Sequence, residues 1–361
     1  MKIVYCIDSL QQSGGTERVL TTKVNWLCLQ LGIECYVITL LEDKEPFFRL
    51  DDKVKHWQID GKNYKQQLSD SLKRIKADIV VAVAGRACNL LPRMEDGSKK
   101  ILEFHYTRNF LVNFVRDLHQ IRFRQLHLLK MRWMQWRLKR LAKKYDRFVG
   151  LTARDVSLWG NMKNMTYIYN PLSFRSEQKS TCLNHKIIAV GSFTPVKGMD
   201  QLIKAFGSIA AKFPDWSVDI YGSGQERGYL EELIDQYGVR NQVSIFAPVA
   251  DIGRELVDAS IYAFPSRSDG FGLVITEAME CGLPTVAMDC ECGPREIVSP
   301  RTGILVQDKD IPGFASALER LMADENLRKR MGAAAQTEVS RFYVENIMPQ
   351  WLTLFDETIK M

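Results

Sequence analysis

Short apolar runs rich in valine and isoleucine recur along the chain, separated by longer stretches with helical spacing. In the first half these runs fall at residues 2–7, 34–40 and 78–84. Runs of this length that are apolar throughout are typical of strands buried on both faces of a parallel sheet. The alternation of strand and helix predicts a doubly wound α/β domain.

The same alternation begins again after the Asn170-Pro171 pair. Predicted strands lie at 186–191, 217–221, 243–246, 261–264 and 284–288, and predicted helices at 199–212, 226–236, 252–259, 271–281, 313–333 and 339–359. Proline disfavours helix at the residue before it, and the polar stretch that runs to Asn184 has the composition of a linker. We expect Rossmann-like domains at 1–171 and 172–340, a hinge near 171–184, and a helix within 341–361 that packs back on the first domain.

Length and composition fit this organisation. The chain has 361 residues, of which 46% are hydrophobic and 25% charged, as in ordinary globular proteins of two domains. No run approaches the roughly 20 apolar residues that a membrane span needs, and the N-terminus lacks the core of a signal peptide. The eight cysteines are scattered, and Cys290 and Cys292 lack partner ligands for a metal. We expect a cytoplasmic protein with reduced thiols and no metal.

A loop with two glycines follows the first predicted strand. Gly14 and Gly15 precede an amphipathic helix that extends to about Leu31. Glycines let a backbone approach a ligand closely, and a helix N-terminus offers unpaired N–H groups to phosphate. The pair is a candidate phosphate contact. Its spacing matches neither G-x-G-x-x-G nor a Walker A loop, and a plain tight turn is the alternative.

Two loops of the second half carry further candidates. Lys197 precedes a helix in the loop after the strand at 186–191, and Asp269 follows the strand at 261–264. Ligands of open α/β sheets bind at the carboxyl edge of the strands, where both loops lie. Asp269 is placed to cap the helix that begins near Phe271, and Glu277 lies about two turns into it. Two carboxylates at this edge suit sugar hydroxyls and ribose, although a capped helix and a solvated lysine are the alternatives.

The stretch from Ser266 to Pro284 resembles a known signature. Asp269 and Glu277, with seven residues between them in S-x-x-D-G-F-G-L-V-I-T-E-A-M, resemble the E-x7-E motif of the retaining GT-B glycosyltransferases of family four. The likeness spans nearly the whole chain, because Gly14-Gly15, G-x-x-x-x-x-K-G at 191–198, Y-G-x-G at 221–224 and G-x-L-V at 303–306 follow in that family's order. The resemblance implies a GT-B fold, with two Rossmann-like domains that face each other across a cleft.

The resemblance also implies roles for single residues. Glu277 would hold the nucleotide ribose, Asp269 would lie near the transferred sugar, and His105 matches the histidine of the first domain near that sugar. The catalytic set is thus His105, Asp269 and Glu277. The implied donor-binding set is Gly14, Gly15, Ser192, Lys197, Gly222, Pro248, Phe271, Gly272, Leu273 and Glu277, with the backbone N–H groups of Phe271, Gly272 and Leu273 meeting sugar or phosphate.

Two positions depart from the family pattern. Asp269 replaces the first glutamate and shortens its reach by one methylene. Ser192 stands where the family has an arginine beside the diphosphate, which leaves Arg267 or Arg18 as replacements for the missing charge. Asp308-Lys309-Asp310 matches the D-x-D of metal-dependent transferases only superficially and is interpreted as a turn after a strand. The run Cys292-Gly293-Pro294-Arg295-Glu296-Ile297 resembles members that use UDP-sugars to extend lipid-linked surface polysaccharides, which favours UDP.

A strongly basic segment lies at residues 116–147. It holds eleven lysines or arginines against Asp117 and Asp146, interleaved with aromatic and aliphatic residues. We expect a helix of this composition to bind an anionic membrane surface. The alternative is a solvated helix on the rim of the domain. Nucleic acid is not expected as a partner, because no DNA- or RNA-binding motif accompanies the charge. The residues assigned to a membrane or acceptor surface are Arg122, Arg124, Lys130, Arg132, Trp133, Trp136, Arg137, Lys139 and Arg140.

Together these features predict a retaining glycosyltransferase on the inner face of the cell membrane. It would move a hexose or N-acetylhexosamine from a nucleotide diphosphate sugar to a lipid-linked saccharide in surface polysaccharide synthesis. No cofactor is expected, because Lys197, helix N-termini and the glycine loop would stabilise the leaving group. The alternatives are a nucleotide-sugar epimerase, a phosphorylase, or a non-catalytic protein that binds membrane surfaces.

Overall fold

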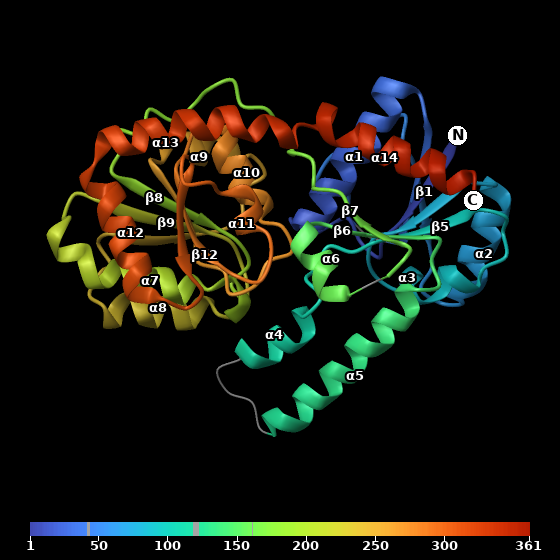
Figure 1. Cartoon of the computed structure of the whole chain (residues 1–361), viewed down its shortest axis with the longest axis horizontal. Coiled ribbons are helices and arrows are strands. Elements are labelled where there is room, and N and C mark those ends of the chain that lie inside the picture. The colour runs from blue at the N-terminus through green and yellow to red at the C-terminus, as the bar shows by residue number, and fades with distance from the viewer. Residues whose placement is uncertain (42–43, 118–122, 161) are drawn as a thin grey trace. The chain divides into compact units, whose positions relative to one another are not determined.

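The structure is a computed structural model that describes residues 1–41, 44–117, 123–160 and 162–361 (Figure 1). The chain forms two compact units. Unit 1 comprises residues 1–108, 133–173 and 342–361, and unit 2 comprises residues 109–132 and 174–341. Residues 109–132, which the sequence pattern assigned to the first domain, therefore group with the second unit.

Unit 1 is built on a seven-stranded sheet with the order β3-β2-β1-β4-β5-β6-β7. All neighbouring strands are parallel, with Lys2 opposite Glu34 and Ile3 opposite Ile79. The strands are β1 (Lys2–Cys6), β2 (Glu34–Leu40), β3 (Lys55–Ile59), β4 (Ile79–Ala82), β5 (Lys99–Glu103), β6 (Arg147–Gly150) and β7 (Met165–Tyr167). The strand order reverses beside β1, as expected for a doubly wound sheet.

The helices of unit 1 include one from the far end of the chain. They are α1 (Gly15–Leu31), α2 (Tyr64–Ile75), α3 (Ala87–Leu90), η1 (Leu91–Arg93), α6 (Ala153–Trp159) and α14 (Val344–Ile359). Helix α14 buries Ile347, Trp351 and Phe355 in the same apolar core as Leu20 and Leu27 of α1. The C-terminal segment is thus part of the core that supports β1.

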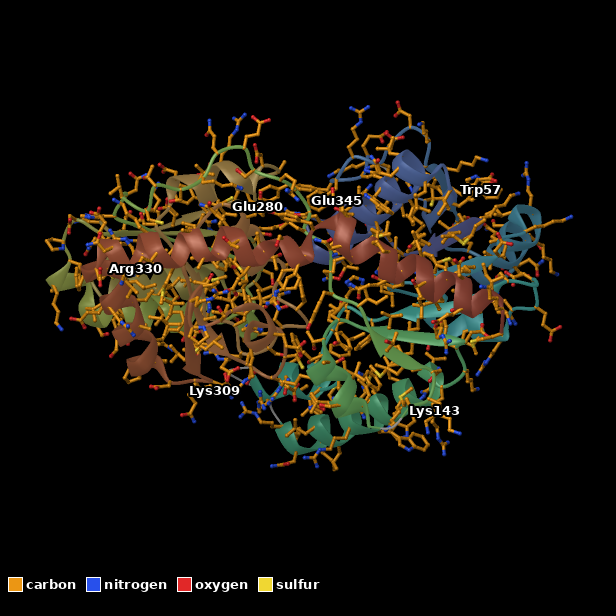
Figure 2. The ribbon with its side chains drawn as sticks, turned by 45° about the horizontal axis from the view of Figure 1, so that its top comes forward. Trp57, Lys143, Glu280, Lys309, Arg330 and Glu345 are labelled. Atoms are coloured by element: carbon orange, nitrogen blue, oxygen red, sulfur yellow. The ribbon has the colours of Figure 1, made fainter. Side chains whose placement is uncertain are left out.

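Unit 2 holds a six-stranded sheet with the order β10-β9-β8-β11-β12-β13. Its strands are also parallel: β8 (Lys186–Val190), β9 (Ser217–Tyr221), β10 (Val243–Phe246), β11 (Ile261–Phe264), β12 (Thr285–Asp289) and β13 (Gly303–Gln307). The prediction of an α/β protein with two parallel sheets is therefore confirmed. Figure 2 shows Lys309 on the connection after β13 and Glu280 at the end of α10.

The helices of unit 2 lie between these strands, apart from one segment that comes from earlier in the chain. They are η2 (Pro195–Lys197), α7 (Met199–Ile209), η3 (Ala210–Lys212), α8 (Arg227–Gln236), α9 (Ile252–Asp258), α10 (Leu273–Glu280), α11 (Pro294–Ile297), α12 (Ile311–Ala323), α13 (Glu325–Glu338) and η4 (Val339–Phe342). Helix α4 (Phe110–Asp117) also belongs to unit 2, and the division between the units crosses α5 (Arg124–Ala142) at Arg132.

Three helix predictions are corrected by the structure. The helix expected at 313–333 is two helices, because the Asp324 carboxylate accepts a hydrogen bond from Leu327 N at 2.8 Å and so caps a new helix. The basic segment is not one helix, since α4 ends at Asp117 and β6 already begins at Arg147. The helix expected from 271 begins at Leu273. Among the described residues, no helix combines the length and apolar character that a membrane span requires.

Candidate active site

Lys197 and Asp269 meet at the carboxyl edge of the unit 2 sheet. Strands β8 and β11 are neighbours, with Ile187 opposite Ile261, so the loops that follow them leave the sheet side by side. The Lys197 ammonium donates to Asp269 Oδ2 in an ion pair that is partly exposed. Two candidates that are 72 residues apart in the sequence are thus brought into direct contact.

A glycine allows this close approach of the two loops. Gly198 has a φ of 65°, and a Cβ at this position would lie 2.1 Å from the carbonyl oxygen of Pro265. Only glycine adopts such a backbone at low cost while leaving room for a neighbouring carbonyl. The turn that presents Lys197 therefore depends on Gly198.

Asp269 organises its own loop. Its Oδ1 accepts hydrogen bonds from the backbone N–H groups of Phe271 at 3.1 Å and Gly272 at 3.0 Å. Gly272, with a φ of 96°, is the residue that precedes α10, and no side chain caps that helix. The prediction that Asp269 caps the helix is therefore wrong in detail. The N–H groups of Phe271 and Gly272, assigned to sugar or phosphate, are bound to this carboxylate in the structure.

Glu277 lies fully buried in α10, and Leu273 at the start of the helix is also buried. Burial raises the pKa of the neighbouring Tyr262 phenol well above its ordinary value, and the negative charges of Asp269 and Glu277 raise it further. The two signature carboxylates thus lie around one buried tyrosine. The assignment of Glu277 to a nucleotide ribose stays a prediction.

The remaining donor-binding candidates of unit 2 lie on loops after β8, β9 and β10. A Cβ at Gly222 would lie 1.9 Å from the carbonyl oxygen of Gly191, so Gly222 is required for two backbones to pass. Ser192 Oγ lies 3.3 Å from Thr194 Oγ1, and Pro248 is exposed. The packing accounts for the glycine, while donor contacts at these three positions stay predictions.

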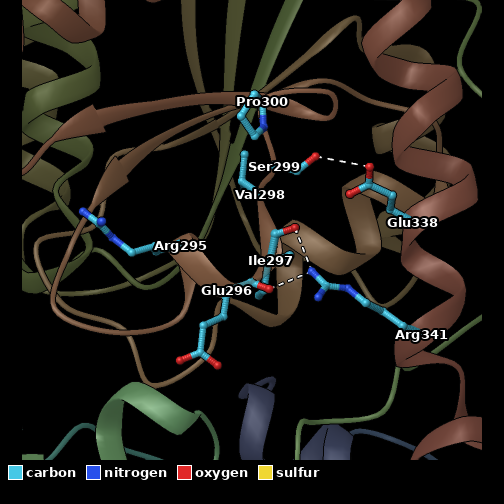
Figure 3. Close-up of a pocket in the computed structure, with 8 residues that line it drawn as sticks. All are labelled: Arg295, Glu296, Ile297, Val298, Ser299, Pro300, Glu338 and Arg341. Atoms are coloured by element: carbon cyan, nitrogen blue, oxygen red, sulfur yellow. Dashed lines mark hydrogen bonds between the residues drawn. The ribbon is translucent and has the colours of Figure 1, made fainter. Parts of the chain in front are cut away.

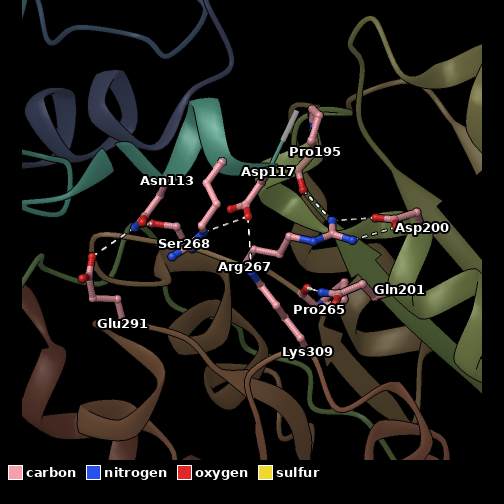
Figure 4. A network of polar contacts seen from close by, with 11 residues as sticks. Asn113, Asp117, Pro195, Asp200, Gln201, Pro265, Arg267, Ser268, Glu291 and Lys309 are labelled. Atoms are coloured by element: carbon pink, nitrogen blue, oxygen red, sulfur yellow. Dashed lines mark hydrogen bonds and ion pairs between the residues drawn. The ribbon is translucent and has the colours of Figure 1, made fainter. Parts of the chain in front are cut away.

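Both arginines proposed as replacements for the missing one, Arg267 and Arg18, already interact with other groups of the chain. Both terminal nitrogens of Arg267 donate to the Asp200 carboxylate at 2.7 Å, and Nη1 also donates to Pro195 O at 2.6 Å (Figure 4). Burial alone raises the pKa of Asp200, but the bonds from Arg267 bring it below its ordinary value. The Arg18 guanidinium in unit 1 lies 4.7 Å from the centre of the Phe48 ring. Arg267 therefore holds the turn at Pro195–Lys197 in place.

Helix α4 contributes polar side chains that the sequence patterns did not single out. Asn113 Nδ2 donates to Glu291 Oε2 at 3.1 Å and to Ser268 Oγ at 3.3 Å (Figure 4), and Ser268 directly precedes Asp269 in the sequence. The Asp117 carboxylate pairs with Lys309 at 3.4 Å. No local sequence pattern predicts these contacts, because they join segments that are 155 to 192 residues apart. They anchor α4 on the loops of unit 2.

In the Asp308-Lys309-Asp310 segment, Lys309 and Asp310 have structural partners. Asp310 Oδ1 accepts a hydrogen bond from Gly313 N at 2.9 Å and caps α12, and Lys309 pairs with Asp117. These contacts are those of a turn that leads from β13 into a helix.

In unit 1 the glycine loop precedes α1 as predicted, with Gly14 at the position before the helix. The Glu17 carboxylate folds back on this loop, so that a Cβ at Gly14 would lie 2.3 Å from Glu17 Oε2. A negative side chain at a helix N-terminus interacts favourably with the helix dipole. A phosphate at Gly14 and Gly15 would therefore have to displace Glu17.

His105 follows β5 and points into the interior of unit 1. Its Nε2 lies 3.1 Å from Glu103 Oε1, and 3% of its side chain is exposed. The second carboxylate oxygen of Glu103 accepts a hydrogen bond from the buried Lys23 ammonium at 2.6 Å. The candidate histidine is thus the end of a buried chain of three ionisable groups.

Helix α5 exposes both its basic and its large apolar side chains. Its buried positions are Gln135 and Ala142, whereas Lys139 donates to the carbonyl oxygen of Trp159. Arg122 lies outside the described residues. Lys143, just past the helix, is exposed as well (Figure 2). The exposed basic and large apolar side chains of α5 and of Phe123 just before it are Phe123, Arg124, Leu126, Leu129, Lys130, Arg132, Trp133, Met134, Trp136, Arg137 and Arg140.

A pocket of about 450 Å³ lies beside α11 in unit 2 (Figure 3). Arg341 donates to the carbonyl oxygens of Glu296 and Ile297, and Ser299 donates to Glu338 at 3.2 Å. The lining residues are Arg295, Glu296, Ile297, Val298, Ser299, Pro300, Glu338 and Arg341. None of the predicted catalytic or donor-binding residues lines this pocket.

Comparisons with known proteins support the GT-B fold and a glycosyltransferase activity. Residues 176–338, which include Lys197, Asp269 and Glu277, match the family described as "Glycosyl transferases group 1". Over 372 residues the chain is 28% identical to an uncharacterized glycosyltransferase of Haemophilus influenzae, covering 97% of this chain and 98% of the relative. It is 26% identical over 370 residues to the amylovoran biosynthesis glycosyltransferase AmsD of Erwinia amylovora, with the same coverage.

A solved structure resembles the whole chain. It is a variant of TarM from S. aureus in complex with fondaparinux, alpha-GlcNAc-glycerol and UDP, with a TM-score of 0.79 and 14% identity. The alignment covers 98% of this chain and 99% of TarM. The likeness confirms that the fold is GT-B.

Proposed function

We propose that this chain, which is a glycosyltransferase with a group 1 domain at residues 176–338, transfers a hexose or N-acetylhexosamine from a nucleotide diphosphate sugar to a lipid-linked saccharide. UDP is the preferred nucleotide, and the anomeric configuration is retained, as in family four. The non-catalytic alternative does not fit a chain with this domain. The observation that carries the proposal is the contact of Lys197 with Asp269 at the carboxyl edge of β8 and β11.

The ion pair provides a way to bind the donor. A diphosphate carries more negative charge than one carboxylate, so it would replace Asp269 as the partner of the Lys197 ammonium. Asp269 Oδ2 would then accept a hydrogen bond from a hydroxyl of the transferred sugar, while Oδ1 keeps its hydrogen bonds from the N–H groups of Phe271 and Gly272. Glu277 would accept the ribose hydroxyls, and Ser192, Gly222, Pro248 and Leu273 would line the nucleotide. The resemblance further implies contacts by Gly14, Gly15 and His105 of unit 1, which would require Glu17 to move off the glycine loop and the buried His105 ring to become accessible.

The reaction itself needs no separate base. The bond between the anomeric carbon and the diphosphate oxygen breaks, and the acceptor hydroxyl forms the new bond on the same face. The departing phosphate oxygen takes the acceptor proton. Lys197 stabilises the charge that develops on the leaving group, since preorganised donors at such a charge are usually the largest catalytic contribution. No metal ion or other cofactor is included in this scheme.

The names of the similar proteins support the choice of substrates. AmsD is named for the biosynthesis of amylovoran, and the TarM structure contains UDP and an N-acetylglucosamine conjugate. A role in surface polysaccharide synthesis and a UDP-linked donor are the corresponding proposals for this chain.

Helix α5 is proposed as the contact with the inner face of the cell membrane. Arg137 and Arg140 stack on the exposed rings of Trp133 and Trp136, at 4.7 and 3.7 Å from the ring centres. Tryptophans beside arginines suit the boundary between headgroups and acyl chains, where each basic residue contributes about 1 kcal/mol on anionic lipid. Lys139 is left out of this surface because it bonds to the chain itself.

The membrane contact is tested with vesicles. Wild type is expected to sediment with vesicles of phosphatidylcholine and phosphatidylglycerol but not with phosphatidylcholine alone. The double variant Trp133→Ser/Trp136→Ser is expected to lose most of this binding, whereas Phe246→Ser, which removes an exposed aromatic ring from β10, keeps it. Equal binding by all three proteins would remove α5 from the proposal.

The enzymatic proposal is tested with a panel of UDP- and GDP-sugars and polyprenyl-diphosphate-linked saccharides as acceptors. Lys197→Ala and Glu277→Ala are each expected to lower turnover by about 10²-fold or more. Lys212→Ala, which removes an exposed lysine of unit 2, serves as the matched control and should keep wild-type turnover. Normal turnover in the Lys197 and Glu277 variants would contradict the assignment of this edge of the sheet.

A further inference from the structure

Unit 1 contains a buried chain of charges that links α1, β5 and the candidate histidine. Lys23 Nζ donates to Glu103 Oε2 at 2.6 Å, and Glu103 Oε1 lies 3.1 Å from His105 Nε2. At most 3% of each of these three side chains is exposed. Removing charges from water is costly, so a buried carboxylate in this position requires the cation beside it.

Two aromatic rings enclose the lysine. The ammonium lies 3.3 Å from the centre of the Trp351 ring on α14 and 5.4 Å from that of Tyr5 on β1. The face of an aromatic ring attracts a cation, most strongly for tryptophan. The C-terminal helix thus helps to hold the ammonium against Glu103.

The partners of the carboxylate also determine its charge. Burial alone raises the pKa of Glu103, but the charge of Lys23 and the hydrogen bond with His105 bring it down to about 2. Burial lowers the pKa of Lys23 to about 8, against the opposing effect of Glu103. At neutral pH the pair is therefore an ammonium and a carboxylate.

We infer that Glu103 is a positioning residue for His105, held in place by Lys23 and Trp351. An ionised carboxylate only accepts hydrogen bonds, so the ring nitrogen facing it must carry the proton. In the neutral ring Glu103 thus selects the tautomer of His105 with the proton on Nε2 and leaves Nδ1 as the nitrogen with a lone pair. A neighbouring acceptor that orients a histidine is a recurrent device in enzymes. The consequence for turnover rests on the proposed function, whereas the tautomer does not.

The tautomer is measured by NMR on the full chain with ¹⁵N-labelled histidine. The chain has five histidines, and the His105→Gln variant identifies the signals of this one. Wild type is expected to show a protonated Nε2 and an unprotonated Nδ1. The variant Lys23→Met/Glu103→Leu replaces the ion pair with apolar side chains of similar size, which buried pairs tolerate. It is expected to fold and to show a mixture of both tautomers.

A conservative variant separates positioning from packing. In Lys23→Met/Glu103→Gln the amide oxygen can still accept a hydrogen bond from Nε2, so the wild-type tautomer is expected to return. With a donor that wild type turns over, kcat is expected to fall by about 10²-fold in the leucine variant and to recover largely in the glutamine variant. The KM for the donor should change less than about twofold, since Glu103 is not assigned to the donor.

The possible outcomes distinguish this inference from the proposed function. A neutral ring with its proton on Nδ1 in wild type, or an unchanged tautomer in the leucine variant, would overturn the positioning role whether or not the enzyme is active. A shifted tautomer with unchanged kcat would overturn its consequence for the reaction. If no donor is turned over by wild type, the proposed function fails, and the NMR result still decides the positioning role.

Discussion

Replacing Lys23 by methionine removes the ammonium that holds the Glu103 carboxylate inside unit 1. The pKa of Glu103 is about 2, against an ordinary 4.5, which corresponds to about 3 kcal/mol in favour of the ionised form. In the variant the carboxylate is buried without its cation. We expect Lys23→Met to lower the free energy of unfolding by about 3 to 5 kcal/mol, as for other buried pairs that lose one partner.

The intact ion pair contributes far less to the free energy of unfolding than is lost when only one of its two partners is removed. Burial lowers the pKa of Lys23 from 10.5 to about 8, against the opposing effect of Glu103, so the cost of burying the ammonium offsets much of what the pair gains. Replacing both partners leaves no uncompensated charge inside unit 1, so Lys23→Met/Glu103→Leu is expected to unfold within about 1 kcal/mol of wild type. Glu103→Leu alone leaves the ammonium buried and should resemble Lys23→Met.

The assay is urea unfolding at neutral pH, followed by circular dichroism and by tryptophan fluorescence. Coincident transitions are required, because a chain with two units can unfold in two steps. The coupling between the substitutions is the difference between the double variant and the sum of the single ones. Single losses that simply add in the double variant would refute the reasoning.

The remaining predictions concern acid unfolding, one glycine and one arginine. The depressed pKa of Glu103 contributes stability that is complete above about pH 4.5 and lost toward pH 2. Between pH 7 and pH 3, wild type should therefore lose about 2 kcal/mol more in urea unfolding than the double variant, and a constant difference would contradict this. Gly198→Ala should lower the melting temperature by several degrees, because a Cβ would lie 2.1 Å from a carbonyl oxygen. The control is Gly228→Ala in α8, where a Cβ would meet no other atom. This substitution should leave the free energy of unfolding unchanged or raise it by up to about 1 kcal/mol. Arg267→Lys keeps the charge but loses the two-pronged bond to Asp200. This substitution should lower the free energy of unfolding, measured by thermal unfolding, by about 1 to 3 kcal/mol and should raise the KM for the donor. If neither value changes, the turn that carries Lys197 does not depend on Arg267.

The class of fold could be predicted from the pattern of apolar residues. Strands such as β1 and β8 are buried on both faces and appear as continuous apolar runs, which is why their bounds agree with prediction to within one residue. The edge strand β3 is half exposed, so no such run marks it. The break at Asp324 was missed because the apolar spacing continues through it, although its capping carboxylate is a local signal.

The sequence by itself determined the fold class and the identity of the main candidates, since Lys197 belongs to one local motif after a recognisable strand, and Asp269 and Glu277 belong to another. Only the tertiary structure decided which groups meet. Lys197 reaches Asp269 because β8 and β11, far apart in the sequence, are neighbours in the sheet. His105 acquires Glu103, Lys23 and Trp351 as partners because α1, β5 and α14 share one core. Local propensity acts over a few residues, whereas the charge and orientation of a buried group depend on everything packed around it.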